Sequence, residues 1–473
     1  MNLGRYLAGY LPLNLASGLA SFGAVYVFTR LLSAEQYGVY ALMIWTLGMI
    51  HTVTLTWVEA AAYRFTAEAE AKGNLADHYR TALSLIFKSL GLALAVAAMV
   101  WFTLRDAPLY AATMPWIAVL LPLNVVIQVA LQAHKAGLRV ERYVFTESFR
   151  LLMGFLLGAL AAWYFGLGSA APFIGMVMAA GLMALREGKW LLEAAKGGQT
   201  SPAREKAWVG YGVPVAAALL LDLVVAGIDR PMIAALMTDG EAAVGVYAAG
   251  YGLADKTVLL LCAWAAMAGG PLLLAAYERG GPQAATEQAQ GFIRMLLFVG
   301  VPAAVGIALV ARPLGEALRE EAIPILPYIA FSGLLNGLTI HYFAHAFQLV
   351  HRTREGVLLM LVPAVLKIVL NLILIPQIGL MGAVYSTLIS YASGVAVLAL
   401  FGRRHVALPL PPGDLLRIGL AALAMWPVIA LLPDIGGWAE LILKAGAGAL
   451  VYAAAALVLD AGGVRTLVRN RFA

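Results

Sequence analysis

Long apolar runs separated by short charged segments follow one another along the whole chain. Each run approaches the ~20 residues that a helix needs to cross the hydrocarbon core of a bilayer. The pattern predicts fourteen spans, near residues 10–29, 38–58, 82–103, 115–133, 143–165, 168–185, 207–228, 244–271, 291–311, 324–347, 356–376, 378–401, 414–432 and 439–459. Residues 59–72 are expected to continue the second helix along the membrane interface.

The composition indicates that the excess apolar surface faces lipid. Apolar residues make up 62% of the 473 residues and charged residues 12%, against about 45–50% and about 25% in soluble domains. We therefore predict an all-α polytopic membrane protein. Its single cysteine, Cys262, excludes an intrachain disulfide and a cysteine metal cluster.

Lysine and arginine are distributed unequally between alternate loops. The ends of the chain and the loops on their side hold 20 of these residues, whereas the opposite loops hold five. Cytoplasmic loops carry such an excess, so both termini, including the basic C-terminal tail, are expected in the cytoplasm of a bacterial inner membrane. Because the net charge of +6 follows the loops, it does not indicate nucleic-acid binding.

Three short motifs recur in the same order and indicate an internal repeat. The pairs are 9–12 with 210–214, 37–41 with 244–248, and 165–168 with 378–382. A six-helix unit returns the chain to the same side, so the halves are expected to be parallel repeats with the substrate path between them. We predict an N-lobe at 1–206, a C-lobe at 207–405, and two further helices with a basic tail at 406–473.

The same regions carry a resemblance to a known family. Residues 30–40, residues 228–230 followed by 245–249, and residues 366–387 resemble three helix junctions of polysaccharide exporters of the O-antigen flippase (Wzx) type. These belong to the multidrug/oligosaccharidyl-lipid/polysaccharide (MOP) flippase superfamily. The resemblance implies a cargo of undecaprenyl-diphosphate-linked sugar and two six-helix lobes forming a V-shaped cavity.

Two other branches of that superfamily fit less well. The multidrug branch usually has twelve helices and an acidic residue in helix 1, and this chain has neither feature. The lipid II flippases have a charged signature in helix 1, where here only Asn14, Ser17 and Ser21 interrupt the apolar run.

Several charges fall inside predicted spans. A charge at the bilayer centre costs at least ~2.5–3.5 kcal/mol, so each needs a pathway or a partner. A diphosphate headgroup requires cations. We assign Lys256 and Lys367, near the midplane, as headgroup candidates, with Arg230 near the periplasmic mouth and the shallower Lys88.

Acidic residues at similar depth are candidates for coupling or for ion pairs. Asp222 and Asp229 are seven residues apart and are expected on one helix face. Asp255 adjoins Lys256 but points about 100° away from it. Two alternatives to a substrate or coupling role stay open: an ion pair of Asp222 with Lys256, and snorkelling of the lysine stems to the interface.

No cofactor or metal site is predicted. His341 and His345 have the spacing of two ligands on one helix face, but the sequence offers no third ligand nearby. Polar faces of the tenth span explain them better.

Three functions compete. The first is a flippase for a lipid-linked oligosaccharide, with that lipid, membrane lipids and the polymerase and glycosyltransferases of the pathway as partners, acting as a monomer. The second is a drug or small-molecule exporter of the same fold. A membrane polymerase or ligase is the third, and its long histidine-bearing external loop is missing here.

Overall fold

The computed structural model describes residues 9–465, and this range forms helices joined by turns, with no strand. Arg5, Arg469 and Arg471, which contribute to the charge distribution between the loops, lie outside the described residues. The predicted all-α membrane fold is confirmed. Contacts divide the chain into two compact units, Met1–Pro231 with Glu241–Gly245, and Met232–Gly240 with Val246–Ala473.

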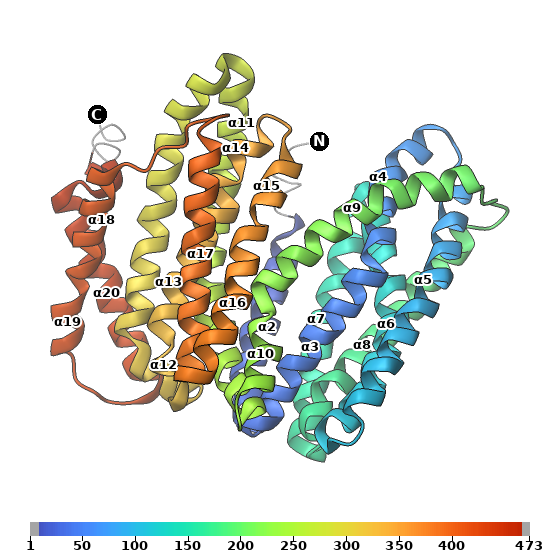
Figure 1. The fold of residues 1–473 in the computed structure, drawn as a ribbon, viewed down its shortest axis with the longest axis horizontal. Helices are drawn as coiled ribbons and strands as arrows, with labels where there is room; N and C mark the ends of the chain where they lie inside the picture. Colours follow the sequence, from blue (N-terminus) through green and yellow to red (C-terminus); the bar gives the residue numbers. More distant parts are fainter. Residues whose placement is uncertain (1–8, 466–473) are drawn as a thin grey trace. The chain divides into compact units, whose positions relative to one another are not determined.

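The first unit contains eight α-helices among its described residues (Figure 1). They are α2 (Leu11–Leu31), α3 (Ala34–Thr54), α4 (Thr56–Ala71), α5 (Leu75–Leu104), α6 (Pro108–Ala136), α7 (Val140–Phe165), α8 (Ala171–Ala194) and α9 (Pro202–Gly227). Helix α9 packs on α4 and α3 and therefore groups by contact with this unit. The repeat pattern assigns most of α9 to the second lobe, and that assignment stays a prediction.

The short helix α10 (Asp229–Leu236) leads into the second unit. The helices that follow are α11 (Gly240–Leu309), α12 (Ala311–Ala317), α13 (Leu326–Leu338), a π-helical turn (Thr339–Phe343), α14 (His345–Gln348), α15 (Thr353–Leu359), α16 (Leu361–Ile378), α17 (Leu380–Gly402), α18 (Pro412–Leu423), α19 (Met425–Leu431) and α20 (Gly437–Leu459).

Helix α11 is a hairpin of two helical arms (Figure 1). The arms meet at Gly280 and Gly281, and Gly281 has φ 68° and ψ −158°, a conformation open essentially to glycine alone. Gly269 on one arm packs against the ring of Phe292 on the other. These positions are almost equally far from the kink, so the arms run antiparallel and correspond to the predicted spans at 244–271 and 291–311.

By length and composition, 11 described helices are able to cross a membrane, or up to 12 if the bent pair α3–α4 is one span. That figure counts the α11 hairpin once. It also leaves out α13 and α14, which the π-helical turn separates. The chain is thus a multi-pass membrane protein, and the number of fourteen spans stays a prediction.

Local sequence explains how α3 begins. The Ser33 hydroxyl accepts a hydrogen bond from the Gln36 backbone N–H at 3.1 Å, and the Gln36 side chain accepts one from the Ser33 N–H at 3.2 Å. This reciprocal capping satisfies two backbone donors that the first turn leaves open. After a 55° bend at Leu55, α4 continues the helix as the sequence predicts.

The first residues of α11, Glu241–Gly245, group by contact with the first unit and pack on α3 at glycines of the repeated motif. A Cβ atom on Gly38 of α3 would overlap the backbone of Glu241, and one on Gly245 would overlap the backbone of Ala34. The helix backbones are therefore in direct contact, which only small residues allow.

Candidate functional site

The second unit buries a lysine in the middle of its helices. Lys367 on α16 is completely buried, and its Nζ lies 5.4 Å from the centre of the Tyr391 ring on α17. The ring face is electron-rich, so it favours the ammonium group. The Lys367 backbone carbonyl accepts a hydrogen bond from Ser386 at 3.0 Å, which joins α16 to α17 at the same level.

Tyrosines from α11 extend this polar region. The Tyr251 and Tyr391 hydroxyls are 3.0 Å apart, and the Tyr247 hydroxyl lies 3.1 Å from Oγ1 of Thr387. All four side chains are buried. Buried hydroxyls are costly unless they are hydrogen-bonded, so these two bonds fix α11 against α17 in one register.

Asp255 belongs to the same cluster. It lies one helical turn after Tyr251 and therefore on the same face of α11, and it is 3% exposed. Gly333 of α13 packs directly against it. Because Tyr251 also bonds to Tyr391, the hydroxyl pair links the helix face of the carboxylate to the ring that contacts Lys367. Asp255 and Lys367 are thus both buried in the second unit and are connected through Tyr251 and Tyr391.

Asn371 lies one turn after Lys367 on the same face of α16, and we call these two residues the polar stripe of α16. It is fully buried, and its amide nitrogen donates to the sulfur of Met232 at 3.6 Å. The stripe faces the interior of the second unit and not its surface.

Lys256 differs from Lys367 because it is exposed. The next residue in the chain, Thr257, lines an apolar groove of about 430 Å³. The groove runs between α11 and the helices α19 and α20, with Phe298, Ile429 and Tyr452 among its walls. Lys444 is the one charged residue of this lining, and Glu440 (2.7 Å) and Asp434 (2.6 Å) hold its ammonium group.

The first unit contains four other predicted residues, Lys88, Asp222, Asp229 and Arg230. Lys88 of α5 is mostly exposed and forms an ion pair with Glu205 of α9 at 2.7 Å. Asp222 of α9 is exposed, and Arg230 is half-buried with its guanidinium 3.4 Å from the Ala226 carbonyl oxygen. Because Asp222 and Lys256 lie in different units, their ion pair stays a prediction.

Asp222 and Asp229 do not share one helix. Helix α9 ends at Gly227 and Asp229 begins α10, and Asp229 is fully buried whereas Asp222 is exposed. The expectation of a shared helix face is therefore wrong. The seven-residue spacing gave no indication of the break, which Gly227 favours through its low helix propensity.

The two histidines of the tenth span lie where the helix is irregular. His341 is in the π-helical turn and His345 begins α14. Within residues 9–465, no group of three or more histidine, cysteine or acidic residues is arranged to hold a metal ion.

A buried ionic network in the first unit was missed from the sequence. Glu187 of α8 is completely buried and bonds to His134 of α6 at 2.8 Å, to Arg142 of α7 at 2.9 Å and to Thr146 of α7 at 3.0 Å. Hydropathy ends the sixth span at residue 185, but α8 continues to Ala194. A signal was available, because Met183, Glu187 and Leu191 recur at four-residue intervals and all three are buried.

A multi-pass helical bundle of this kind, with charges buried at mid-helix, is typical of membrane transporters. Solved structures show which fold it is. The chain is similar to the lipid II flippase MurJ in an inward closed conformation, with a TM-score of 0.73 and 15% identity over 98% of this chain and 100% of that one.

It is also similar to an inward-facing multidrug resistance MATE family transporter of the MOP superfamily, with a TM-score of 0.61 and 16% identity over 82% of this chain and 94% of that one. A variant of the Vibrio cholerae MATE transporter VcmN gives a TM-score of 0.54 and 15% identity, over 84% and 97% of the two chains. The chain therefore has the MOP superfamily fold.

The sequence profile of the family described as "Polysaccharide biosynthesis protein" matches residues 8–271. The chain belongs to this family. Comparison with curated protein sequences gives no significant match. Family and fold together confirm the predicted membership in the MOP superfamily, and both resemble flippases and transporters and not enzymes.

Proposed function

We propose that this protein is a flippase that moves an undecaprenyl-diphosphate-linked oligosaccharide from the cytoplasmic to the periplasmic leaflet by alternating access. It acts in the bacterial inner membrane with both termini in the cytoplasm, and it catalyses no bond chemistry. The observation that carries the proposal is the polysaccharide biosynthesis family match over residues 8–271 on a chain whose whole length has the fold of a lipid flippase.

The second unit offers surfaces suited to both ends of such a cargo. A polyprenyl tail is apolar and flexible, and the groove between α11, α19 and α20 is apolar with a volume of about 430 Å³. The exposed Lys256 precedes the groove residue Thr257 in the chain and supplies a cation for a phosphate. Lys367, Arg230 and Lys88 complete the proposed set of cations, and Asp222, Asp229 and Asp255 are the proposed coupling acids.

A reconstituted assay tests the proposal. The purified protein is placed in liposomes that carry a lipid-linked oligosaccharide in both leaflets, and a membrane-impermeant glycosidase is added outside. We expect digestion to proceed beyond the outer-leaflet fraction only when the protein is present. Digestion limited to the outer leaflet, together with protein-dependent movement of a cationic dye, would favour the multidrug exporter instead.

The proposed partners follow from this cargo. The glycosyltransferases that build the lipid-linked unit and the polymerase that consumes it would act on opposite faces of the same membrane. We propose a monomer as the working unit, and light scattering of the purified protein in detergent tests that number.

A further inference from the structure

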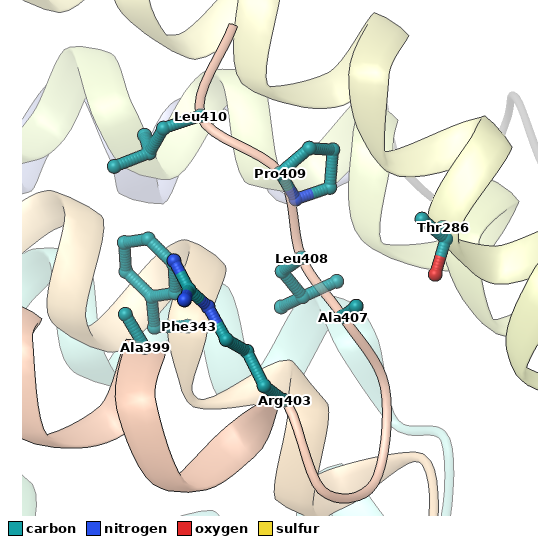
Figure 2. Close-up of a pocket in the computed structure, with 8 residues that line it drawn as sticks. All are labelled: Thr286, Phe343, Ala399, Arg403, Ala407, Leu408, Pro409 and Leu410. Atoms are coloured by element: carbon teal, nitrogen blue, oxygen red, sulfur yellow. The ribbon is translucent and has the colours of Figure 1, made fainter.

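A second, smaller pocket lies at the end of the spanning helix α17 and has a volume of about 220 Å³. Figure 2 shows the residues that line it. The pocket is bounded by Phe343 of the π-helical turn, by Ala399 and Arg403 at the end of α17, by Thr286 of α11, and by the segment Ala407–Leu410, which we call the strap. Apart from Arg403 and Thr286, these side chains are apolar.

The strap is fixed in place, so the pocket is already formed. The Tyr342 hydroxyl donates to the Pro409 carbonyl at 2.7 Å. Leu408 of the strap is buried, and so are Phe343 below it and Val406 just before it. A site formed in advance requires little ordering when a ligand binds.

Arg403 carries a charge that no described side chain neutralises. It forms no hydrogen bond or ion pair with another residue of the described range. The nearby carboxylate of Glu355 is occupied by His405 at 3.0 Å and by Arg352 at 3.8 Å. The next residue, Arg404, lies over the Phe401 ring at 5.0 Å and does not line the pocket.

We propose that this pocket binds an anionic phospholipid, with the lipid phosphate on the Arg403 guanidinium and the glycerol and first acyl carbons against Phe343 and the strap. The position supports this occupant, because α17 is long and apolar enough to span a membrane and ends at Gly402, which would place Arg403 at the level of the lipid headgroups. Basic pockets between spanning helices are known to hold anionic headgroups on the cytoplasmic side. The guanidinium fork matches phosphate geometry, and the apolar walls favour a lipid over a free anion.

Variants at two adjacent arginines test the site. Purified wild type, Arg403→Gln and Arg404→Gln are placed in phosphatidylcholine vesicles with and without phosphatidylglycerol, and lipid binding is measured by native mass spectrometry and thermal unfolding. We expect Arg403→Gln to weaken phosphatidylglycerol binding by about tenfold, the loss of one charged hydrogen bond. Arg404→Gln removes the same charge from the same helix end and should bind like wild type.

Equal losses in both variants would overturn the site, because they would indicate a general charge effect. An unchanged affinity in Arg403→Gln would overturn it as well. If soluble glycerol phosphate stabilises the wild type as much as phosphatidylglycerol does, the occupant is a free phosphate and not a lipid. Ala399→Leu, which fills the pocket and keeps the charge, should also reduce lipid binding.

The lipid measurement requires no transported cargo. If the wild type does not transport the cargo in the liposome assay but Arg403→Gln weakens phosphatidylglycerol binding, the proposed function would be refuted and the lipid site supported. If the protein transports the cargo but Arg403→Gln binds phosphatidylglycerol normally, the lipid site would be refuted and the proposed function supported.

Discussion

Two buried charges, Glu187 in the first unit and Lys367 in the second, lie at different positions along their helices. In the first unit, Glu187 joins His134 in the last turn of α6 to Arg142 in the first turn of α7. In the second unit, Lys367 lies in the interior of α16 and contacts the Tyr391 ring in the interior of α17. Figure 1 shows both helix groups, each within its own unit.

This difference suggests different roles for the two charges. Glu187 connects neighbouring helices, whereas Lys367 is a candidate for a role in transport. Near helix ends, water and headgroups lie close, and Glu187 has three bonded partners on two neighbouring helices. At mid-helix a charge costs at least ~2.5–3.5 kcal/mol. Methionine would fill the Lys367 site without that cost, so the presence of a lysine favours a role in transport.

The largest expected effect is the loss of the first-unit network. Glu187→Gln removes the carboxylate, which leaves Arg142 without its counter-charge and weakens the hydrogen bond to His134, and this should lower the free energy of unfolding by about 3 kcal/mol. Thermal unfolding of the purified protein measures this loss. Glu193→Gln, at an exposed position of the same helix, is the control and should match wild type. Equal stability of both variants would contradict a structural role for the network.

The second effect concerns the buried lysine. Lys367→Met removes the charge and keeps the volume of the side chain, so it should change the free energy of unfolding much less than breaking the first-unit network does. The protein that remains folded should be inactive in the liposome assay. Full transport per folded molecule would show that Lys367, like Glu187, only holds helices together.

The third effect is confined to transport. Lys256 is exposed, so Lys256→Met should leave stability unchanged and reduce lipid-linked oligosaccharide transport about tenfold, the loss of one charged contact. Lys256→Arg keeps the cation and should retain most transport.

A double variant distinguishes this role from a pair with Asp222. Asp222→Asn with Lys256→Met should be as inactive as the single lysine variant. Recovery of transport in the double variant would establish the ion pair and remove Lys256 from the headgroup site.

The smallest effect is a pH dependence outside the spans. Hydrogen bonds from Lys444 and Arg312 hold the pKa of the Asp434 carboxyl below its usual range. A depressed carboxyl pKa stabilises the folded state above the unfolded value of about 3.9, and this contribution is lost as pH falls through the folded pKa. Asp434→Asn should therefore unfold slightly more easily at neutral pH and converge with wild type in acid. The measurement is the melting temperature of wild type and Asp434→Asn as a function of pH. A constant difference between the two down to acid pH would contradict the prediction.

Sequence alone determined most of the fold, because hydropathy acts locally and at the length of one span. The predicted runs correspond to the observed helices, including the two arms of α11 and the continuation of α3 into α4. It also identified Lys367 and Asp255 as notable, since charge is rare within apolar runs. The family resemblance was carried by similarly local motifs at helix junctions.

Tertiary structure alone decided which side chains meet. Lys88 pairs with Glu205 from 117 residues away, and Glu187 bonds to His134 from 53 residues away. No local sequence pattern indicates which residues far apart in the chain will pair. Hydropathy also gives depth along a helix but not the direction that a side chain faces, so Lys256 and Lys367 looked equivalent until helix packing exposed one and buried the other. The physical reason is that a span is recognised by its own residues, whereas the environment of a charge is set by the helices packed around it.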